Sequence, residues 1–248
     1  MTEVFESTVR DGVLRLRRPK TRWLSTGHAG GESLGPVAYN VSVPEGWDDR
    51  DVDGYVERRL AAAGFERPGP TLLTGVSMRH ARRARLGPVE AVVTAGVSNP
   101  AALPVDGELG RPARGTPPDD HAGTVNVLVG TTRSLGPGAL ANLVAVAAEA
   151  KATTLLSRAG VPGTTTDAVV AACDPAGDRA SYSGSATDVG GAARACVRDA
   201  LCASLDSRYA EDDGGATAAA ADAPYGVVTD ERASVSRVLT AENDGEAL

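Results

Sequence analysis

The feature that most constrains the fold is a run of three apolar elements within residues 123–173. Their periodicity and length predict strands over Val125–Val129 and Ala168–Ala172, and a helix over about Pro137–Arg158. Elements this apolar are buried over most of their surface. Polar side chains nevertheless lie within them or at their ends, and each costs free energy beside apolar surface unless it has a partner. The combination indicates a functional site rather than a plain core.

The other predicted elements are closely spaced strands and two further helices. Strands are expected over 12–17 and 36–43 and in the runs that end at 77 and 100, and helices over 50–63 and near 190–205. Because strands and helices do not alternate strictly, the sequence predicts the α+β class. We expect a single domain with a mixed or largely antiparallel sheet and long helices packed on one side. A four-layer αββα sandwich is one arrangement of these elements.

Charge divides the chain into two parts. Residues 1–210 contain 23 basic and 23 acidic side chains, whereas residues 211–248 contain 2 basic and 9 acidic ones. We therefore expect one folded domain over 1–210 and a flexible acidic tail over 211–248. The balanced domain has no nucleic-acid footprint, and its basic cluster Arg79–Arg85 is interpreted as a solvated connection, with anion binding as the alternative. Scarce lysine and abundant aspartate are typical of proteins from salt-loving archaea.

The sequence also bears on compartment and partners. The N-terminal residues lack a basic segment followed by an apolar run, so no signal peptide is predicted. The most apolar run, Leu140–Ala148, is far shorter than the roughly 20 residues that span a bilayer. Three cysteines without metal-ligand spacing fit a reduced compartment. We expect a cytoplasmic protein with no membrane partner and no metal site, and a homo-oligomer is compatible with the sequence.

Familiar catalytic motifs are missing from the chain. The pattern G-x-S-x-G occurs once, at residues 31–35, but the chain continues into the strand predicted over 36–43 and not into the helix that a nucleophile elbow requires. The chain contains no H-E-x-x-H motif, and its three histidines are scattered through loops or charged segments. A Ser-His-Asp hydrolase or a zinc enzyme therefore has little support. The groups that remain as candidates for binding and catalysis are side-chain amides and hydroxyls, together with a few charged side chains.

Amides and glycines mark the ends of several predicted strands. Asn40, Asn99 and Asn126 lie in or beside strands, where asparagine is a poor fit without hydrogen-bonding partners. Their amides could hold a substrate amide or an oxyanion, and the alternative is that they cap turns or bulges. Gly30 and Gly31 belong to a glycine-rich loop that could bring backbone N–H groups to a ligand.

Charged and hydroxyl groups border the long helix and the strand that follows it. Glu149 and Lys151 lie two residues apart on the helix, and Asp167 precedes the second strand. A partly buried glutamate could act as a base, and Asp167 could activate water or orient a threonine. The alternatives are the solvent edge of an amphipathic helix for Glu149 and a cap or turn for Asp167.

Five short segments resemble, in the same order, the adenosylcobinamide amidohydrolase (CbiZ) family. They are LST…GG…YNVSV (24–43), TAGVSNP (94–100), GTVNVLV (123–129), AEAK (148–151) and GTTTDAVV (163–170). The resemblance covers roughly residues 10–206, includes the run Tyr182–Thr187 and leaves out the acidic tail. It implies a cytoplasmic salvage enzyme that hydrolyses the amide joining aminopropanol to a corrin side chain and releases adenosylcobyric acid for coenzyme B12 synthesis. The corrinoid is then a small-molecule substrate, and no cofactor is implied.

The resemblance carries no settled catalytic residues, so their roles are hypotheses. We assign the base role to Asp167 or Glu149 and the electrostatic or proton-donor role to Lys151. The carbonyl oxygen would be held by Asn99, Asn126 and Thr166. Further candidates for binding the amide-rich macrocycle are Asn40, Thr164, Thr165, Gly30, Gly31 and Ser98.

Two other readings remain open at this point. One is an amidase with another substrate, in which a threonine at 164–166 becomes the nucleophile after self-cleavage near Gly163. The other is a corrinoid-binding protein that performs no reaction.

Overall fold

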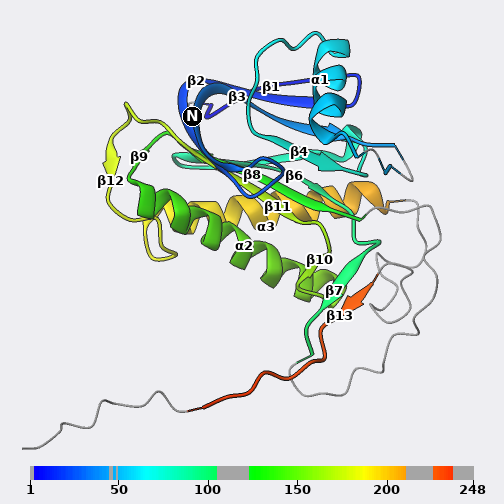
Figure 1. Cartoon of the computed structure of the whole chain (residues 1–248). Helices are drawn as coiled ribbons and strands as arrows, with labels where there is room; N and C mark the ends of the chain where they lie inside the picture. The colour runs from blue at the N-terminus through cyan, green and yellow to red at the C-terminus, as the bar shows by residue number, and fades with distance from the viewer. Residues whose placement is uncertain (1–2, 45–46, 49, 105–122, 211–225, 237–248) are drawn as a thin grey trace, which may run out of the picture.

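The structure, a computed structural model, describes residues 3–44, 47–48, 50–104, 123–210 and 226–236 (Figure 1). Its core is an eight-stranded sheet in the order β4-β3-β2-β11-β8-β6-β5, with β1 paired to β2. These strands are β1 Glu6–Arg10, β2 Val13–Ser25, β3 Gly31–Ser42, β4 Thr71–Thr74, β5 Arg82–Leu86, β6 Val89–Ala95, β8 Val125–Thr131 and β11 Ala168–Cys173.

The remaining elements are helices and short strands. The helices are α1 Val52–Ala62, α2 Pro137–Ala159 and α3 Asp188–Arg208, with a 3-10 turn at Met78–His80. Short strands form two small sheets, β10-β7-β13 and β12-β9. Their bounds are β7 Pro100–Ala102, β9 Ser134–Leu135, β10 Gly163–Thr164, β12 Arg179–Ala180 and β13 Val227–Val228.

The main sheet is mixed, as the sequence predicted. β8 pairs with β11 and β3 pairs with β4 in parallel, whereas the other neighbours are antiparallel. The predicted strand, helix and strand of residues 123–173 are β8, α2 and β11. Gly160 ends α2 with a φ of 71°, in the left-handed conformation that glycine adopts without a Cβ penalty. The α+β class is confirmed.

A hydrogen bond reveals that the sheet folds over on itself. Asn40 on β3 donates to the Thr94 hydroxyl on β6 at 2.9 Å, although three strands separate β3 from β6 in the sheet order. In a flat sheet these strands would lie roughly 19 Å apart, since neighbours are about 4.8 Å apart. The β1–β4 half therefore faces the half formed by β5, β6, β8 and β11, and apolar side chains such as Trp23 and Leu128 fill the space between them.

Helices cover both outer faces of this sandwich (Figure 1). Long helices α2 and α3 pack on the outer face of β6, β8 and β11. On the opposite side, Leu60 of α1 packs against Val37 and Val41 of β3. Reading across the molecule, the layers are α1, one half of the sheet, the other half, and then α2 with α3. The predicted packing of long helices on one side and the αββα arrangement are both observed.

The position of helix α2 in the fold explains why its sequence is so apolar. By length and composition it is able to cross a membrane. It packs instead against the sheet and α3, with Leu140, Leu143 and Leu155 almost fully buried. The helix is therefore apolar because it fills the core.

The structure differs from the sequence prediction in the basic cluster. Instead of a solvated connection, residues 78–80 form a 3-10 turn and Arg82–Leu86 form the edge strand β5. Arg83 and Arg85 pair with Glu90, which is fully buried, at 3.0 and 2.7 Å. Charged side chains on an edge strand discourage pairing with another chain, and here they also neutralise a buried carboxylate.

Candidate functional site

The strand ends that carry the predicted site residues meet at one end of the sandwich. Asn126, near the start of β8, is paired in register with Thr94 near the end of β6 and with Ala168 at the start of β11. Its amide also donates to the Leu73 carbonyl of β4 at 2.9 Å. One residue thus links four strands, and the polar groups of distant segments are assembled around it.

A buried amide network ties the two halves of the sheet together at this end. Asn126 donates to Asn40 Oδ1 at 2.9 Å, and Asn40 in turn donates to Thr94 Oγ1 at 2.9 Å. Both asparagines are fully buried. Side chains enclosed in this way offer no surface to a ligand, so we reassign Asn40 and Asn126 from substrate contacts to positioning residues.

A cavity of about 390 Å³ opens beside this network. Two hydroxyls on its wall, those of Thr124 and Thr166, lie 2.7 Å apart. Thr166 is exposed and Thr124 is buried. The wall is built from the glycine-rich loop, the segment that follows β3, strand β4 with the residue after it, and the beginnings of β8 and β11 with the residues just before them. Its residues are Gly27, His28, Val43, Trp47, Leu72, Leu73, Thr74, Gly75, Thr124, Thr166 and Ala168.

A second polar cluster lies at the same end of the sheet but faces α2. Lys151 of α2 donates to Asp167 Oδ2, and their side chains are only 12% and 10% exposed. Asp167 also accepts the Val125 N–H at 2.9 Å, the Thr164 N–H at 3.0 Å and the Thr164 hydroxyl. A carboxylate has about four acceptor sites, and these donors occupy them. Asp167 therefore has no acceptor site left for a water proton.

Strand geometry places these two clusters on opposite faces. Successive side chains of an extended chain point to opposite sides. Val125 and Val169 pack with the α2 and α3 core, whereas Leu128 and Val170 fill the space between the half-sheets. Asp167 follows the α2 side and Thr166 the inner side, which agrees with their partners. The cavity wall includes neither Lys151 nor Asp167.

The close packing around the Lys151–Asp167 pair also explains why residue 163 is a glycine. A Cβ on Gly163 would lie 2.8 Å from Asp167 Oδ2 and 3.1 Å from Lys151 Nζ. Strand β10 therefore passes close to the ion pair, and a larger residue at position 163 would displace the ends of the Asp167 and Lys151 side chains. The turn that follows carries Thr166 into the cavity.

Three other predicted residues lie around the same turn. The Thr165 N–H donates to the Asn99 carbonyl at 3.1 Å, while β10 pairs with β7 immediately after Asn99. Asn99 is buried, and its Oδ1 has no partner among the described residues. Ser98 is half-buried, with its N–H 2.4 Å from where a Cβ on Gly123 would lie. These residues support the turn, and none of them lines the cavity.

Glu149 is the predicted residue that the structure separates from the others. Its side chain is 54% exposed on α2 and pairs with Arg194 of α3. The helix turns it away from the Lys151–Asp167 pair, because it lies two positions from Lys151 on a helix with 3.6 residues per turn. Glu149 does not line the cavity either. We therefore remove Glu149 from the candidates for the base.

The glycine-rich loop contributes to the cavity wall, but not through the two glycines that the sequence predicted. Gly27 and His28 line the cavity, whereas Gly30 and Gly31 are exposed and shape the turn behind them. The Gly30 N–H donates to the Gly27 carbonyl at 3.0 Å. His28 Nε2 lies 2.9 Å from Asp53 of α1, with both side chains well exposed.

Thr124 and Trp47 were missed by the sequence analysis. Alternation gives a signal for Thr124, since it precedes Asn126 by two residues and shares its face. Nothing in the sequence marks Trp47, which reaches the wall from the segment between β3 and α1. Its position depends on packing against Tyr55 of α1, with ring centroids 5.1 Å apart.

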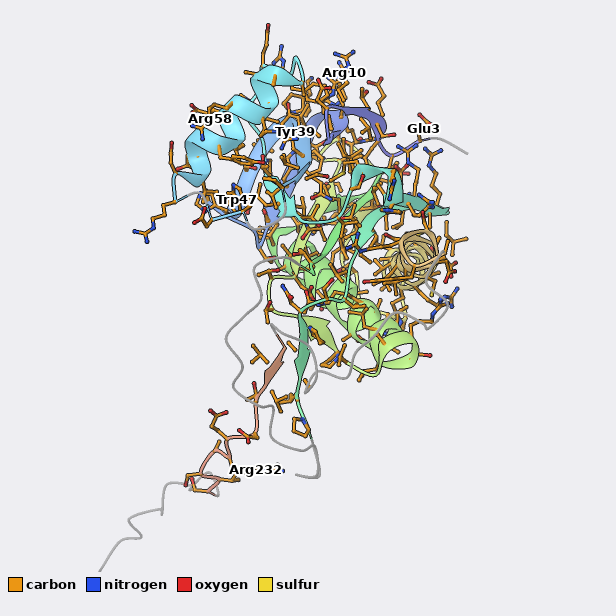
Figure 2. All side chains as sticks on the ribbon, turned by 90° about the vertical axis from the view of Figure 1, so that its right-hand side faces the viewer. Glu3, Arg10, Tyr39, Trp47, Arg58 and Arg232 are labelled. Atoms are coloured by element: carbon orange, nitrogen blue, oxygen red, sulfur yellow. The ribbon has the colours of Figure 1, made fainter. Side chains whose placement is uncertain are left out.

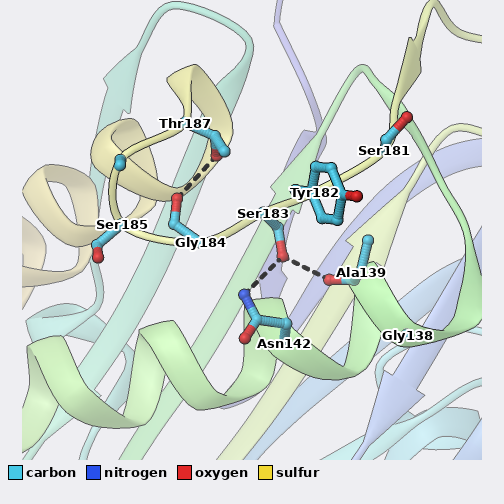
Figure 3. Close-up of a pocket in the computed structure, with 10 residues that line it drawn as sticks. Gly138, Ala139, Asn142, Ser181, Tyr182, Ser183, Gly184, Ser185 and Thr187 are labelled. Carbon is cyan, nitrogen blue, oxygen red and sulfur yellow. Dashed lines mark hydrogen bonds between the residues drawn. The ribbon is translucent and has the colours of Figure 1, made fainter.

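A second, larger cavity of about 670 Å³ lies where α2 and α3 begin (Figure 3). In Figure 1 these helix starts lie at the end of the molecule away from β7 and β10. Ser183 in its wall donates to the Ala139 carbonyl at 2.6 Å and accepts from Asn142 at 3.1 Å. Its lining includes none of the predicted catalytic residues. We therefore take the threonine-lined cavity as the candidate site.

Thiols and metal ligands add no further candidate within the described residues. Cys173 and Cys196 are buried, and burial raises the pKa of both thiols, that of Cys196 to about 11. A thiol with a raised pKa is a poor nucleophile. Among the described residues, no three His, Cys, Asp or Glu side chains are grouped as a metal site requires.

Comparison with known proteins assigns the family. The sequence model of the adenosylcobinamide amidohydrolases (CbiZ) matches residues 1–213. An adenosylcobinamide amidohydrolase of Halobacterium salinarum is 55% identical over 239 residues, which covers 94% of this chain and 100% of the relative. One from Methanosarcina mazei is 27% identical over 195 residues, covering 75% of this chain and 90% of the relative.

The similarity of this chain to solved structures is weaker. A protein from Pyrococcus horikoshii gives a TM-score of 0.43 at 12% identity, covering 81% of this chain and 78% of the other. This score is too low to support a conclusion. The family match and the full-length relative are sufficient, and they confirm the resemblance seen in the sequence: the chain belongs to the adenosylcobinamide amidohydrolase family.

Proposed function

We propose that the chain hydrolyses the amide that joins aminopropanol to a corrin side chain of adenosylcobinamide, releasing adenosylcobyric acid in cobinamide salvage. The observation that carries this proposal is the 55% identity to the Halobacterium salinarum adenosylcobinamide amidohydrolase over that protein's whole length. The halophilic source of the relative agrees with the lysine-poor, aspartate-rich composition of this chain. The cytoplasm, where cobinamide would be salvaged, is the proposed location.

The reaction makes three demands on the site. A water oxygen bonds to the carbonyl carbon, the C–N bond breaks, and a proton from the water passes to the departing nitrogen. The enzyme has to orient the amide, stabilise the oxyanion and move that proton. Hydroxyl groups on a cavity wall meet the first two demands.

We place the scissile carbonyl at the hydroxyl pair of Thr124 and Thr166. The bond between the oxygens uses one of the pair's two protons, and Thr166 otherwise donates to the Gly123 carbonyl over a long contact of 3.4 Å. We propose that the substrate carbonyl oxygen replaces the Gly123 carbonyl as the acceptor of that weak bond. Because Thr166 is exposed and lines the cavity, it is the group we assign to this contact.

Lys151 and Asp167 act on this site through the backbone. Asp167 anchors the turn of residues 164–167 by accepting from Thr164 and from Val125 of β8, and Lys151 neutralises its charge. A residue held on such a turn keeps its hydroxyl in place during the reaction. We assign Lys151 and Asp167 as positioning residues rather than as proton donor and base.

The direct test uses the purified full-length chain and adenosylcobinamide. Mass spectrometry should detect aminopropanol and adenosylcobyric acid in equal amounts. A change in the corrinoid spectrum without aminopropanol release would instead support the binding-protein reading. The intact mass adds a second readout: a single chain of 25.2 kDa is expected, and two fragments would support the self-processing threonine.

A further inference from the structure

The candidate cavity is small compared with the proposed substrate. Its volume of about 390 Å³ is near the lower end of small-molecule pockets, which measure about 300–1,000 Å³. Adenosylcobinamide combines a corrin macrocycle with an adenosyl group, and together they are several times larger than the amino-alcohol arm. The cavity therefore has room for the arm and not for the ring.

The wall of the cavity has two chemically distinct parts. Leu72 and Ala168 provide apolar surface from β4 and β11, and Val43 extends it from the chain after β3. Thr124 and Thr166 provide the hydroxyl pair. An apolar surface beside two hydroxyls matches a short aliphatic chain that contains one amide.

Trp47 adds an aromatic surface to this wall. Figure 2 shows Trp47 beside α1, where its ring packs against Tyr55 with an interplanar angle of 50°. Its indole Nε1 is shielded from solvent and so does not border the cavity. The carbon atoms of the ring are therefore the part that a ligand meets, and they suit the aliphatic end of the arm.

We propose that this cavity is the subsite for the amino-alcohol arm and that the corrin ring stays outside its mouth. The arm's methylene and methyl groups lie on Leu72 and Ala168, and its amide carbonyl meets Thr166. Its terminal carbon atoms also contact the ring of Trp47. This inference rests on the proposed function, because it assumes that the cleaved amide is the one in that arm.

The second cavity provides a matched control for this assignment. It lies at the other end of the molecule, and its buried Ser183 already has both a donor and an acceptor. Ala186 in its wall is exposed, as a position that tolerates a larger side chain should be. Filling each cavity in turn therefore compares two similar changes at different places.

The first experiment measures kcat/KM for adenosylcobinamide in Ala168→Leu and Ala186→Leu. Ala168→Leu should lower kcat/KM by about tenfold or more, because the added methyl groups occupy the space for the arm. Ala186→Leu should match the wild type. Wild-type kcat/KM in a folded Ala168→Leu variant would overturn the proposal.

The second experiment does not depend on a variant that folds poorly. It uses N-(2-hydroxypropyl)propanamide, which is the arm without the ring, as a probe of the wild-type protein and of Trp47→Ala. Saturation-transfer NMR should detect the probe on the wild type, with at least severalfold weaker binding to Trp47→Ala, which lacks the ring surface. Absence of binding to the wild type, or equal binding to both proteins, would overturn the arm subsite.

The two experiments separate this inference from the proposed function. If the wild-type chain releases no aminopropanol from adenosylcobinamide, the proposed function fails, whatever the probe does. If the wild type is active and the Ala168 and Trp47 variants behave like it, only the arm subsite fails. Release of aminopropanol together with loss in Ala168→Leu supports both.

Discussion

Two polar clusters lie at the same end of the sandwich and differ in how their hydrogen-bonding capacity is used. Thr124 and Thr166 face the cavity, and beyond their mutual bond Thr166 makes a long, weak bond of 3.4 Å to the Gly123 carbonyl. Lys151 and Asp167 face α2, and four donors occupy the Asp167 carboxylate. One cluster is open to a substrate, and the other is closed by the protein itself.

The difference teaches that a conspicuous charge in the sequence does not by itself mark a group with hydrogen-bonding capacity left for a substrate. The ion pair is the more conspicuous feature in the sequence, but its saturation suits it to hold the turn that presents Thr166. The neutral pair includes the exposed Thr166 hydroxyl, whose bond to the Gly123 carbonyl is long enough for a substrate to replace. We therefore expect variants of the two clusters to differ in size of effect and to act through the same step.

Thr166→Val should have the largest effect on activity. The change keeps the shape of the side chain and removes the proton that we assign to the carbonyl oxygen. Loss of such a donor typically lowers kcat by about 10²–10³-fold. Steady-state kinetics with adenosylcobinamide provide the measurement. Thr166→Ser is the control, because it keeps a hydroxyl and should retain most of the activity.

Lys151→Met should have the next largest effect. It leaves Asp167 without its cationic partner, so we expect kcat to fall by about tenfold to a hundredfold as the turn that carries Thr166 shifts. The pair is about nine-tenths buried, and breaking it should lower the free energy of unfolding by about 3 kcal/mol. Urea denaturation measures that loss. Wild-type stability together with a complete loss of kcat would indicate direct chemistry by Lys151.

Asn126→Leu should affect stability more than catalysis. The change keeps a similar volume but leaves the Asn40 Oδ1 and the Leu73 carbonyl without their donor. Each buried unsatisfied acceptor costs about 1–3 kcal/mol, so the free energy of unfolding should fall by at least about 2 kcal/mol. Unchanged stability with a hundredfold lower kcat would return Asn126 to the substrate contacts.

Glu149→Gln should have the smallest effect. Its pair with Arg194 is largely exposed, and exposed pairs contribute about 0.2–1 kcal/mol. Both kcat and the unfolding midpoint should stay close to the wild type. A hundredfold loss of kcat would restore Glu149 as a base.

Much of the fold was predictable from periodicity. The β8, α2 and β11 run has clear valine-rich and alanine-rich segments bounded by Pro137 and Gly160, so its elements were found nearly to the residue. Strand β2 was predicted too short. It continues through the polar run RRPKTR, where Lys20 has a φ of 53° and the pairing with β3 shifts register. A bulge of this kind removes the alternation on which the prediction depends.

The site was only partly predictable. Sequence patterns singled out Thr166, Lys151 and Asp167, which the structure places at one end of the sandwich, because motif order and strand ends are local information. Folding of the sheet onto itself places Asn40 against Thr94 and Asn126, and no local pattern contains that contact. The burial of the asparagines, the saturation of Asp167 and the arrival of Trp47 all follow from tertiary packing. Residues 211–248, expected to form an acidic tail, lie mostly outside the described residues.

A double-variant cycle tests most directly whether the closed cluster, Lys151 and Asp167, affects the reaction by positioning Thr166 of the open cluster. It compares kcat for adenosylcobinamide in Thr166→Val, Lys151→Met and the double variant, with folding checked by circular dichroism. If Lys151 acts by placing Thr166, the double variant should be no slower than Thr166→Val alone, because the hydroxyl to be placed is already absent. If the two losses multiply, Lys151 contributes independently of Thr166, and the division between an open reacting cluster and a closed positioning cluster is contradicted.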